Sequence, residues 1–248
     1  MPPSTLPNEI DADMDSPFEF SQGLGDDFSG EVRLFPLPNA VLFPHVLLPL
    51  HIFEPRYIAM TRDALEGDGL IALAQIRDGW ELTESDSPDI HPVICIGRIA
   101  HHVELEDGRY NLIVQGLSRA SIIEELPLDL PYRQASVELL AEEPISNISQ
   151  EDQRRAELIK NFRKLFPKLD VENELHQVFE SEIPLGILCD VFAYALSLDP
   201  SDAQRLLSEF NVDRRSRLLL QLIEKSLANQ ATQQVESTRE FPPPFSLN

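Results

Sequence analysis

Residues 34–57 read LFPLPNAVLFPHVLLPLHIFEPRY, and this stretch decides the fold class. It contains five prolines, at positions 36, 38, 44, 49 and 55. Proline has no amide hydrogen to donate, so a central strand cannot hold many of them. The pattern predicts an edge strand that bends over a barrel opening, followed by a helix that begins at Pro55. Glu54 and Arg56 flank Pro55, and we expect them to form an ion pair that holds this corner.

The surrounding residues 31–149 carry short β-branched runs separated by proline and glycine, which is typical of strands. These runs are Val32–Phe35, Val46–Leu50, Leu70–Ile76, Val93–Val103, Arg109–Gln115, Ala120–Leu126 and Arg133–Leu140. Asp107-Gly108 predicts a hairpin turn, because this pair tolerates positive φ angles. Gly97 and Gly116 predict bulges or close backbone contacts. One helix is expected among the strands, from Pro55 to Gly67.

From residue 150 onward the apolar spacing becomes helical. The first stripe consists of Leu158, Ile159, Phe162, Leu165 and Phe166, and a shorter one of Val171, Leu175, Val178 and Phe179. Further helices are expected to begin at Pro184 and Pro200, and Asn211 or Asp213 can cap the last one. The sequence therefore predicts an α+β or two-domain arrangement, with a β-rich part over residues 31–148 and a helical bundle over residues 149–229.

Both ends of the chain differ in composition from this body. Residues 1–30 contain seven acidic residues and no lysine or arginine, which predicts a disordered acidic arm. Residues 230–248 are polar and then proline-rich, and we expect a flexible tail. The N-terminus does not resemble a signal peptide, and no stretch of 18 apolar residues is present, so we expect a cytoplasmic protein without a membrane segment.

The charge balance limits the classes of partner. The 248 residues carry a net charge of -22, with only four lysines. Binding of nucleic-acid backbones depends on lysine and arginine, so we expect no nucleic-acid partner. The two cysteines, Cys95 and Cys189, form no metal-binding or disulfide pattern and are expected to be reduced and buried.

Sequence motifs for catalysis are missing. The chain has no GxxxxGK[ST] phosphate loop, no GxSxG and no HExxH. His102 and Glu104 would share one strand face with His101 on the other, which is fewer than the four ligands of a closed metal site. We expect His51 to be a hydrogen-bonded, partly buried histidine. We expect no catalytic residues, no metal and no cofactor.

Several motifs in order resemble one known family, the Lon N-terminal domain, which is the substrate-recognition domain of the ATP-dependent protease Lon. The matching motifs are Phe35-Pro36-Leu37, Val41-Leu42-Phe43-Pro44, Leu48–Tyr57, Ile96-Gly97-Arg98-Ile99, Asp107–Leu112, Gln115–Arg119 and Leu198–Leu207. The resemblance covers about residues 31 to 228. It implies a pseudo-barrel related to the PUA fold, followed by a helical bundle. His45 departs from the family, which commonly has glycine there, so the geometry of this turn is in question.

The resemblance implies a function as well as a fold. In the full protease this domain captures unfolded or tagged protein segments. The ATPase and Ser–Lys protease modules follow it there, and since this chain ends after the bundle we expect a non-enzymatic, polypeptide-binding module in protein quality control. The candidate binding residues are Leu42, Phe43, Val46, Phe53 and Tyr57. The alternative for each residue is that it belongs to the barrel core.

Three other functions compete with this one. The first is an adaptor that hands its client to a protease or chaperone, with the acidic arm as the contact. The second is a structural or oligomerisation scaffold for one specific partner, which includes the possibility of a homo-oligomer. The third is a hydrolase of unknown type, which no motif supports.

Overall fold

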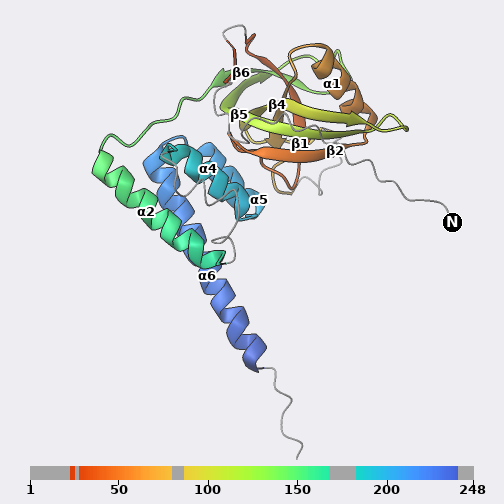
Figure 1. Ribbon diagram of the computed structural model, residues 1–248. Helices are drawn as coiled ribbons and strands as arrows, with labels where there is room; N and C mark the ends of the chain where they lie inside the picture. The colour runs from red at the N-terminus through yellow and green to blue at the C-terminus, as the bar shows by residue number, and fades with distance from the viewer. Residues whose placement is uncertain (1–22, 26–27, 80–86, 168–182, 240–248) are drawn as a thin grey trace, which may run out of the picture.

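The computed structural model describes residues 23–25, 28–79, 87–167 and 183–239, with side chains up to residue 230. Figure 1 shows a β-barrel and a helical bundle packed side by side, joined by an extended segment between β6 and α2. The α+β class is confirmed, with the strands and one helix in the first part of the chain and the helical bundle after them. Of the acidic arm predicted over residues 1–30, residues 1–22 and 26–27 lie outside the described residues, as does the predicted stripe at 171–179.

Six strands build the sheet: β1 (Glu31–Leu37), β2 (Leu47–Ile52), β3 (Leu70–Gln75), β4 (Val93–Glu104), β5 (Tyr110–Glu125) and β6 (Gln134–Leu139). Their order is β2-β5-β4-β3-β1-β6, and β6 also pairs with β5. This last pairing closes β1, β3, β4, β5 and β6 into a barrel, and leaves β2 at the edge. Pro49 therefore lies in an edge strand, as the proline pattern predicts.

The two runs predicted as separate strands at Arg109–Gln115 and Ala120–Leu126 form one 16-residue strand, β5. Gly116 does not end the strand. A β-carbon at this position would overlap the carbonyl oxygen of Phe43, so only glycine lets the 39–46 segment approach β5. The register of β4 against β5 shifts next to Gly97 and Gly116, as expected for bulges.

Helix α1 (Pro55–Glu66) begins and ends where the sequence predicts, with proline in its first turn and Gly67 at its C-terminus. Its buried face consists of Tyr57, Met60, Thr61 and Ala64. The predicted hairpin turn is also present, with Gly108 at a φ of 80° and its N–H donating to the carbonyl of Leu105.

The bundle consists of α2 (Ile148–Leu165), α4 (Leu185–Ala195), α5 (Pro200–Ser208) and α6 (Val212–Arg239). Leu158, Phe162 and Leu165 of the predicted stripe are buried, and the rings of Phe162 and Phe192 stack 3.9 Å apart. The Asn211 side chain accepts from the N–H of Arg214 and so caps α6. This helix continues to Arg239, past residue 229 where the bundle was predicted to end, and Figure 1 shows it projecting from the body.

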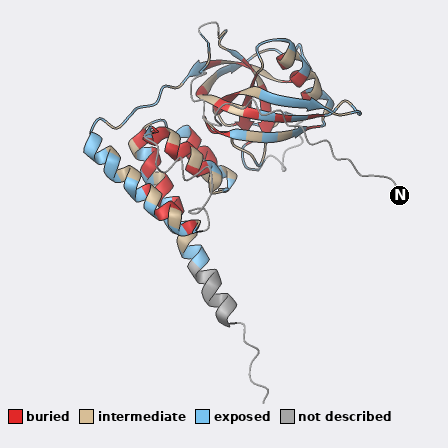
Figure 2. Ribbon diagram, viewed as in Figure 1, coloured by how far each residue is buried: buried red, intermediate tan, exposed pale blue. Residues whose placement is uncertain are grey.

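Two apolar clusters form the interior, drawn red in Figure 2. One fills the barrel, with members such as Leu34, Ile94 and Val137. The other runs from the outer side of the sheet under α1 to the bundle, so the barrel and the helices share it.

Candidate functional site

An open groove lies where the proline-rich segment, α1 and the 127–133 loop meet. Its volume is about 650 Å³. Its walls are rich in proline, with Pro36, Pro38, Pro88 and Pro131, and Tyr57 and Tyr132 contribute their rings. Leu128 stands at the groove with 69% of its surface exposed. A concave site lined by rigid apolar groups with a few charges is the usual form of a binding site.

Tyr57 is held in place from two sides. Its ring lies 4.5 Å from that of Phe35, and the Arg56 guanidinium lies 4.7 Å over its face. Such a cation–π contact is favourable, because the ring face is electron-rich. Burial raises the pKa of the Tyr57 hydroxyl above its usual value. The ring therefore serves as a fixed, neutral part of the groove.

The polar rim of the groove is made of paired groups. Arg56 donates to the Glu54 carboxylate at 3.0 and 2.8 Å, so these residues form an ion pair at the corner. Arg133 donates to Glu125 at 2.7 Å and to the carbonyl of Pro88 at 2.8 Å. These contacts fix the polar rim beside the apolar walls.

The edge of β1 also faces the groove. On the side of β1 that pairs with β6, the Leu34 N–H donates to the Arg133 carbonyl. This is the last contact of β1 on that side, because the 127–133 loop then leaves the strand. Backbone groups alternate along a strand, so position 36 faces the same side. Pro36 has no N–H there and so leaves no donor without a partner. The proline is what allows β1 to border an open groove.

The structure separates the five candidate binding residues. Leu42, Phe43 and Val46 are buried in the shared core, which supports the alternative that they are core residues. Tyr57 is also mostly buried but lines the groove. Phe53 is 61% exposed and lies against His51, with ring centroids 6.0 Å apart, on a different surface. The ribbon thus alternates between core and surface instead of forming one binding stripe.

His45 adopts a turn geometry that favours glycine. Its φ is 64°, in the left-handed region that favours glycine. The N–H of His45 donates to the Gly116 carbonyl at 2.8 Å, and the Gly116 N–H donates to the Val46 carbonyl at 2.9 Å. Burial lowers the pKa of His45 below its usual value. The turn therefore depends on two hydrogen bonds that hold a strained residue in place.

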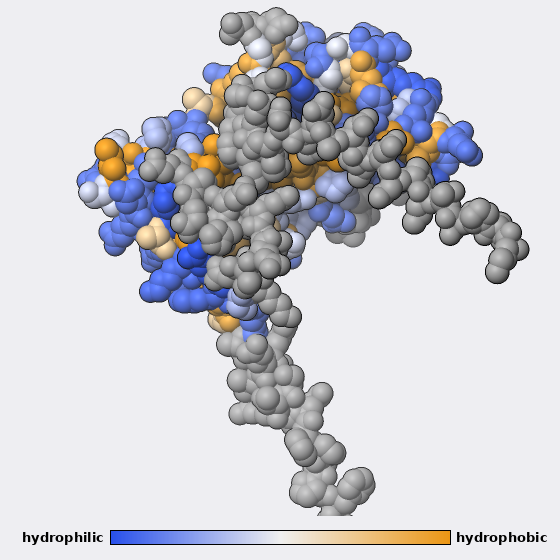
Figure 3. All heavy atoms as spheres, viewed as in Figure 1, coloured by the Kyte–Doolittle hydropathy of each residue, from blue (hydrophilic) through white to orange (hydrophobic). Residues whose placement is uncertain are grey.

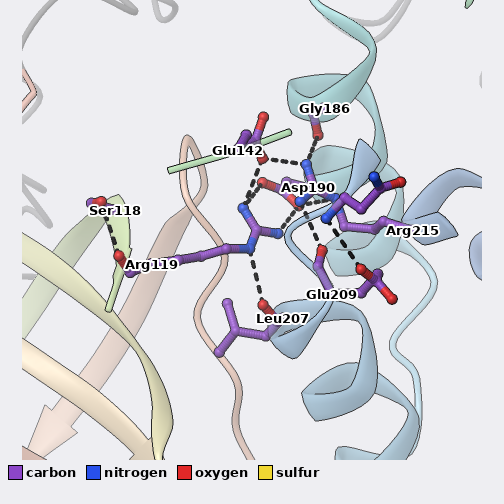
Figure 4. Close-up of polar contacts among 9 residues, drawn as sticks. Ser118, Arg119, Glu142, Gly186, Asp190, Leu207, Glu209 and Arg215 are labelled. Carbon is purple, nitrogen blue, oxygen red and sulfur yellow. Dashed lines mark hydrogen bonds and ion pairs between the residues drawn. The ribbon is translucent and has the colours of Figure 1, made fainter. Parts of the chain in front are cut away.

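A buried charge cluster joins the barrel to the bundle (Figure 4). Arg119 of β5 donates to Asp190 of α4 at 2.9 and 2.6 Å and to the Leu207 carbonyl at 3.0 Å. Glu142 accepts from both Arg119 and Arg215, and Arg215 lies 3.5 Å from Asp190. Buried ion pairs need such additional hydrogen bonds to offset their desolvation. This cluster fixes the two parts of the chain relative to each other and does not face the groove.

The remaining candidate groups have structural roles. Cys95 and Cys189 are free and buried, and burial raises the pKa of Cys189 to about 12. Among the residues that the structure describes, no three histidine, cysteine or acidic side chains gather where they could hold a metal ion. His51 is exposed, not partly buried as predicted, and contacts Asn111 at 2.8 Å and Arg109 at 3.2 Å.

Within the described ranges, no helix is both long enough and apolar enough to cross a bilayer. The longest helix, α6, is mostly polar.

Sequence reasoning did not assign the loop that forms one wall of the groove. Arg133 was predicted only as the first residue of a strand, and Leu128, Pro131 and Tyr132 come from a loop that the predictions left without a role. Its sequence, Leu126-Pro127-Leu128-Asp129-Leu130-Pro131, repeats the alternation of leucine and proline seen in residues 34–38. That alternation was the available signal, but only the fold brings the two segments together.

A closed β-barrel followed by a helical bundle, with an apolar groove on the barrel, defines an α+β binding domain. The chain belongs to the family of the ATP-dependent protease La (LON) substrate-binding domain, whose model matches residues 31–225. The chain therefore carries a substrate-recognition module of the Lon type.

Curated relatives agree with this assignment. Lon protease of Anaeromyxobacter dehalogenans is 25% identical over 203 residues, which are 81% of this chain and 24% of that protein. Lon protease of Brevibacillus choshinensis is 28% identical over 221 residues, 85% of this chain and 28% of that protein. The chain thus spans about a quarter of the length of the curated relatives it matches.

Two solved structures share the fold. The Lon N-terminal domain protein from Xanthomonas campestris has a TM-score of 0.55 and 21% identity, over 77% of this chain and 96% of that one. The N-terminal domain of Mycobacterium avium complex Lon protease has a TM-score of 0.57 and 17% identity, over 78% of this chain and 98% of that one.

Proposed function

We propose that the groove binds extended segments of unfolded or tagged polypeptides, as a recognition step in protein quality control. The observation that carries this proposal is the position of Tyr57 and Leu128 in one open groove beside the edge of β1. Apolar side chains of an extended segment can fill the space between the proline walls. The Pro36 carbonyl can accept a backbone hydrogen bond from the same segment.

Unfolded chains are the class of ligand that this groove suits. A folded protein buries its apolar side chains and pairs its backbone, so it offers neither to the groove. An unfolded chain exposes both. The net charge of -22 favours segments that carry lysine and arginine, and it accelerates their encounter at low salt.

A fluorescence-anisotropy titration tests the proposal. The intact protein is titrated with a labelled, permanently unfolded polypeptide, and a labelled folded protein serves as the control ligand. We expect saturable binding of the unfolded chain only. Binding should weaken between low and high salt, because exposed charges are screened.

A pair of matched variants locates the binding surface. Leu128→Ser changes an exposed leucine of the groove, and Ile123→Ser changes an isoleucine that is 64% exposed on β5 and does not line the groove. We expect Leu128→Ser to raise the Kd about ten-fold, since 1.4 kcal/mol of lost apolar contact corresponds to that factor. Equal Kd values for the two variants would place the binding surface elsewhere.

We further propose that a bound client is passed to a protease or chaperone. The matched relatives carry this region as about a quarter of a protease, which supports a partner of that kind. The test is degradation of the unfolded polypeptide by a purified ATP-dependent protease with and without this protein. We expect faster degradation with the protein present, and an unchanged rate would reject the adaptor role.

A further inference from the structure

One end of the barrel carries an exposed sheet that the groove does not use. Strand β3 begins at Leu70, which pairs with Arg98 of β4. Beyond Arg98, strands β4 and β5 continue without β3, and β2 extends them on the other edge. These three strands project from the barrel and end at the Asp107-Gly108 turn, on the right in Figure 1.

One side of this projection is apolar and exposed, and we name it the projecting face. The strand register places Ile113 of β5 between Pro49 of β2 and His101 of β4. It likewise places His51 and Val103 beside Asn111. The exposed apolar side chains on or next to this face are Leu47, Phe53, Val103 and Ile113. A shallow hollow of about 390 Å³ lies among Pro49, His101 and Ile113.

Apolar area of this kind on a soluble protein usually marks a contact surface. Figure 3 shows hydrophobic side chains exposed among hydrophilic ones on this part of the barrel. The charges are also unusual. The strand segments 47–52, 98–103 and 109–115 contain no aspartate or glutamate, and two histidines, His51 and His101, lie on the projecting face. In a chain with a net charge of -22, such strand segments are unusual, and the carboxylate of Asp107 in the adjoining turn pairs with Arg109 at 2.6 Å.

The N-terminal arm begins beside this surface. Strand β1 runs parallel to β3, with Leu34 beside Ala72, so Val32 lies at the level of Leu70 at the same barrel end. Just before β1, the side chains of Leu24 and Phe28 pack on the barrel-filling cluster. Side-chain alternation along β4 and β5 continues the inner side of the barrel into the projecting face. The described part of the arm therefore leads toward this face.

The composition of residues 1–22 complements the projecting face. They contain Glu9, Asp11, Asp13, Asp15 and Glu19, with no lysine or arginine, and two aromatic residues, Phe18 and Phe20. Twenty-two residues reach about 70 Å when extended. The face is about 20 Å long, from Arg98 to Glu104 along β4. The arm is long enough to cross it.

We propose that the N-terminal acidic arm of the same chain covers the projecting face. Phe18 and Phe20 occupy the apolar positions near Ile113 and Val103, and the acidic residues lie near Arg98, His51 and His101. The arm thus serves as an intramolecular cover for an apolar surface whose strand segments 47–52, 98–103 and 109–115 carry no carboxylate. This proposal does not depend on polypeptide binding in the groove.

Disulfide trapping in the full-length chain tests this proposal. The native cysteines are buried, so introduced cysteines react selectively. One variant combines Ser16→Cys with Ile113→Cys on the projecting face. The control combines Ser16→Cys with Ile123→Cys, at an exposed isoleucine elsewhere on β5. Under mild oxidation we expect an intramolecular disulfide at least ten-fold faster in the first variant.

Two further variants separate specific docking from chance encounter. Adding Phe18→Ser and Phe20→Ser to the Ile113→Cys variant should reduce its rate to that of the control. Raising the salt concentration should slow the trapping, because salt screens the attraction between opposite charges. Equal rates for the Ile113→Cys and Ile123→Cys variants would overturn the proposal. Disulfide-linked dimers in place of intramolecular products would overturn it too, since the arm would then cover a second copy.

Discussion

The guanidinium of Arg119 on β5 holds the carboxylate of Asp190 on α4 with two hydrogen bonds of 2.9 and 2.6 Å. The two side chains are 2% and 1% exposed and lie 71 positions apart in the sequence. One belongs to the barrel and the other to the bundle (Figure 4). Their contact makes the two parts of the chain one folded unit.

Removing one member of the Arg119–Asp190 pair should destabilise the folded protein. We expect Arg119→Met to lower the free energy of unfolding by about 3–5 kcal/mol, because it leaves Asp190 buried with less compensation. Chemical denaturation of the full-length protein measures this loss. Arg109→Met is the matched control, because the Arg109–Asp107 pair is exposed and should contribute less than about 1 kcal/mol. Similar losses for both variants would contradict the role of the cluster.

Gly116 should be intolerant of any side chain. The β-carbon in Gly116→Ala would overlap the Phe43 carbonyl, which is backbone and cannot rotate away. We expect a loss of about 3 kcal/mol or more, at or above the upper end of overpacking costs. Gly23→Ala is the control, because nothing lies within 4 Å of the added atom. Thermal unfolding of both variants measures the difference, and a Gly116→Ala variant as stable as the parent would show that the 39–46 segment can move away.

Truncation of Phe43 should destabilise the protein much more than truncation of Phe53, although the two residues lie only ten positions apart. Phe43→Ala removes a buried ring and should cost about 3–5 kcal/mol of unfolding free energy. Phe53→Ala removes an exposed ring and should change stability by less than about 0.5 kcal/mol. Chemical denaturation of the two variants measures both changes in unfolding free energy. A folded Phe43→Ala variant of nearly parental stability would reopen a binding role for that residue.

The His45 side chain should make stability depend on pH. Burial lowers the pKa of His45 in the folded state below the usual 6.5, so the unfolded chain binds the proton more tightly. The stabilisation that depends on neutral His45 is therefore present above pH 6.5 and is lost as the pH falls below 6.5. His45→Asn removes the titration and tolerates the positive φ.

The measurement for His45 is the unfolding free energy between pH 7 and pH 5. The parent should lose more stability over this range than the His45→Asn variant. His102→Asn, at an exposed histidine, is expected to retain the parental slope. Parallel curves for the parent and His45→Asn would show that His45 does not contribute to acid sensitivity.

Local patterns determined the order and type of the elements. Pro55 and Gly67 delimit α1, Asp107-Gly108 forms the hairpin turn, and the stripe of Leu158, Phe162 and Leu165 faces the bundle core. Each of these features depends on residues within a few positions of one another, which is why the sequence predicts them. The family resemblance likewise depended on short motifs in order. The length of β5 was mispredicted because Gly116 is typical of a break when its neighbour Phe43 is unknown.

The side on which each apolar residue lies was decided by the tertiary structure. Phe43 and Phe53 occupy similar proline-rich contexts, yet one is core and the other exposed, because Gly116 draws only the 39–46 segment onto β5. The groove needs Tyr57 and Leu128, which are 71 positions apart, and the charge cluster needs Arg119 and Asp190. Sequence by itself specified local conformation and the family. The contacts that form the groove and join barrel to bundle arise from pairing over long separations, which no local pattern encodes.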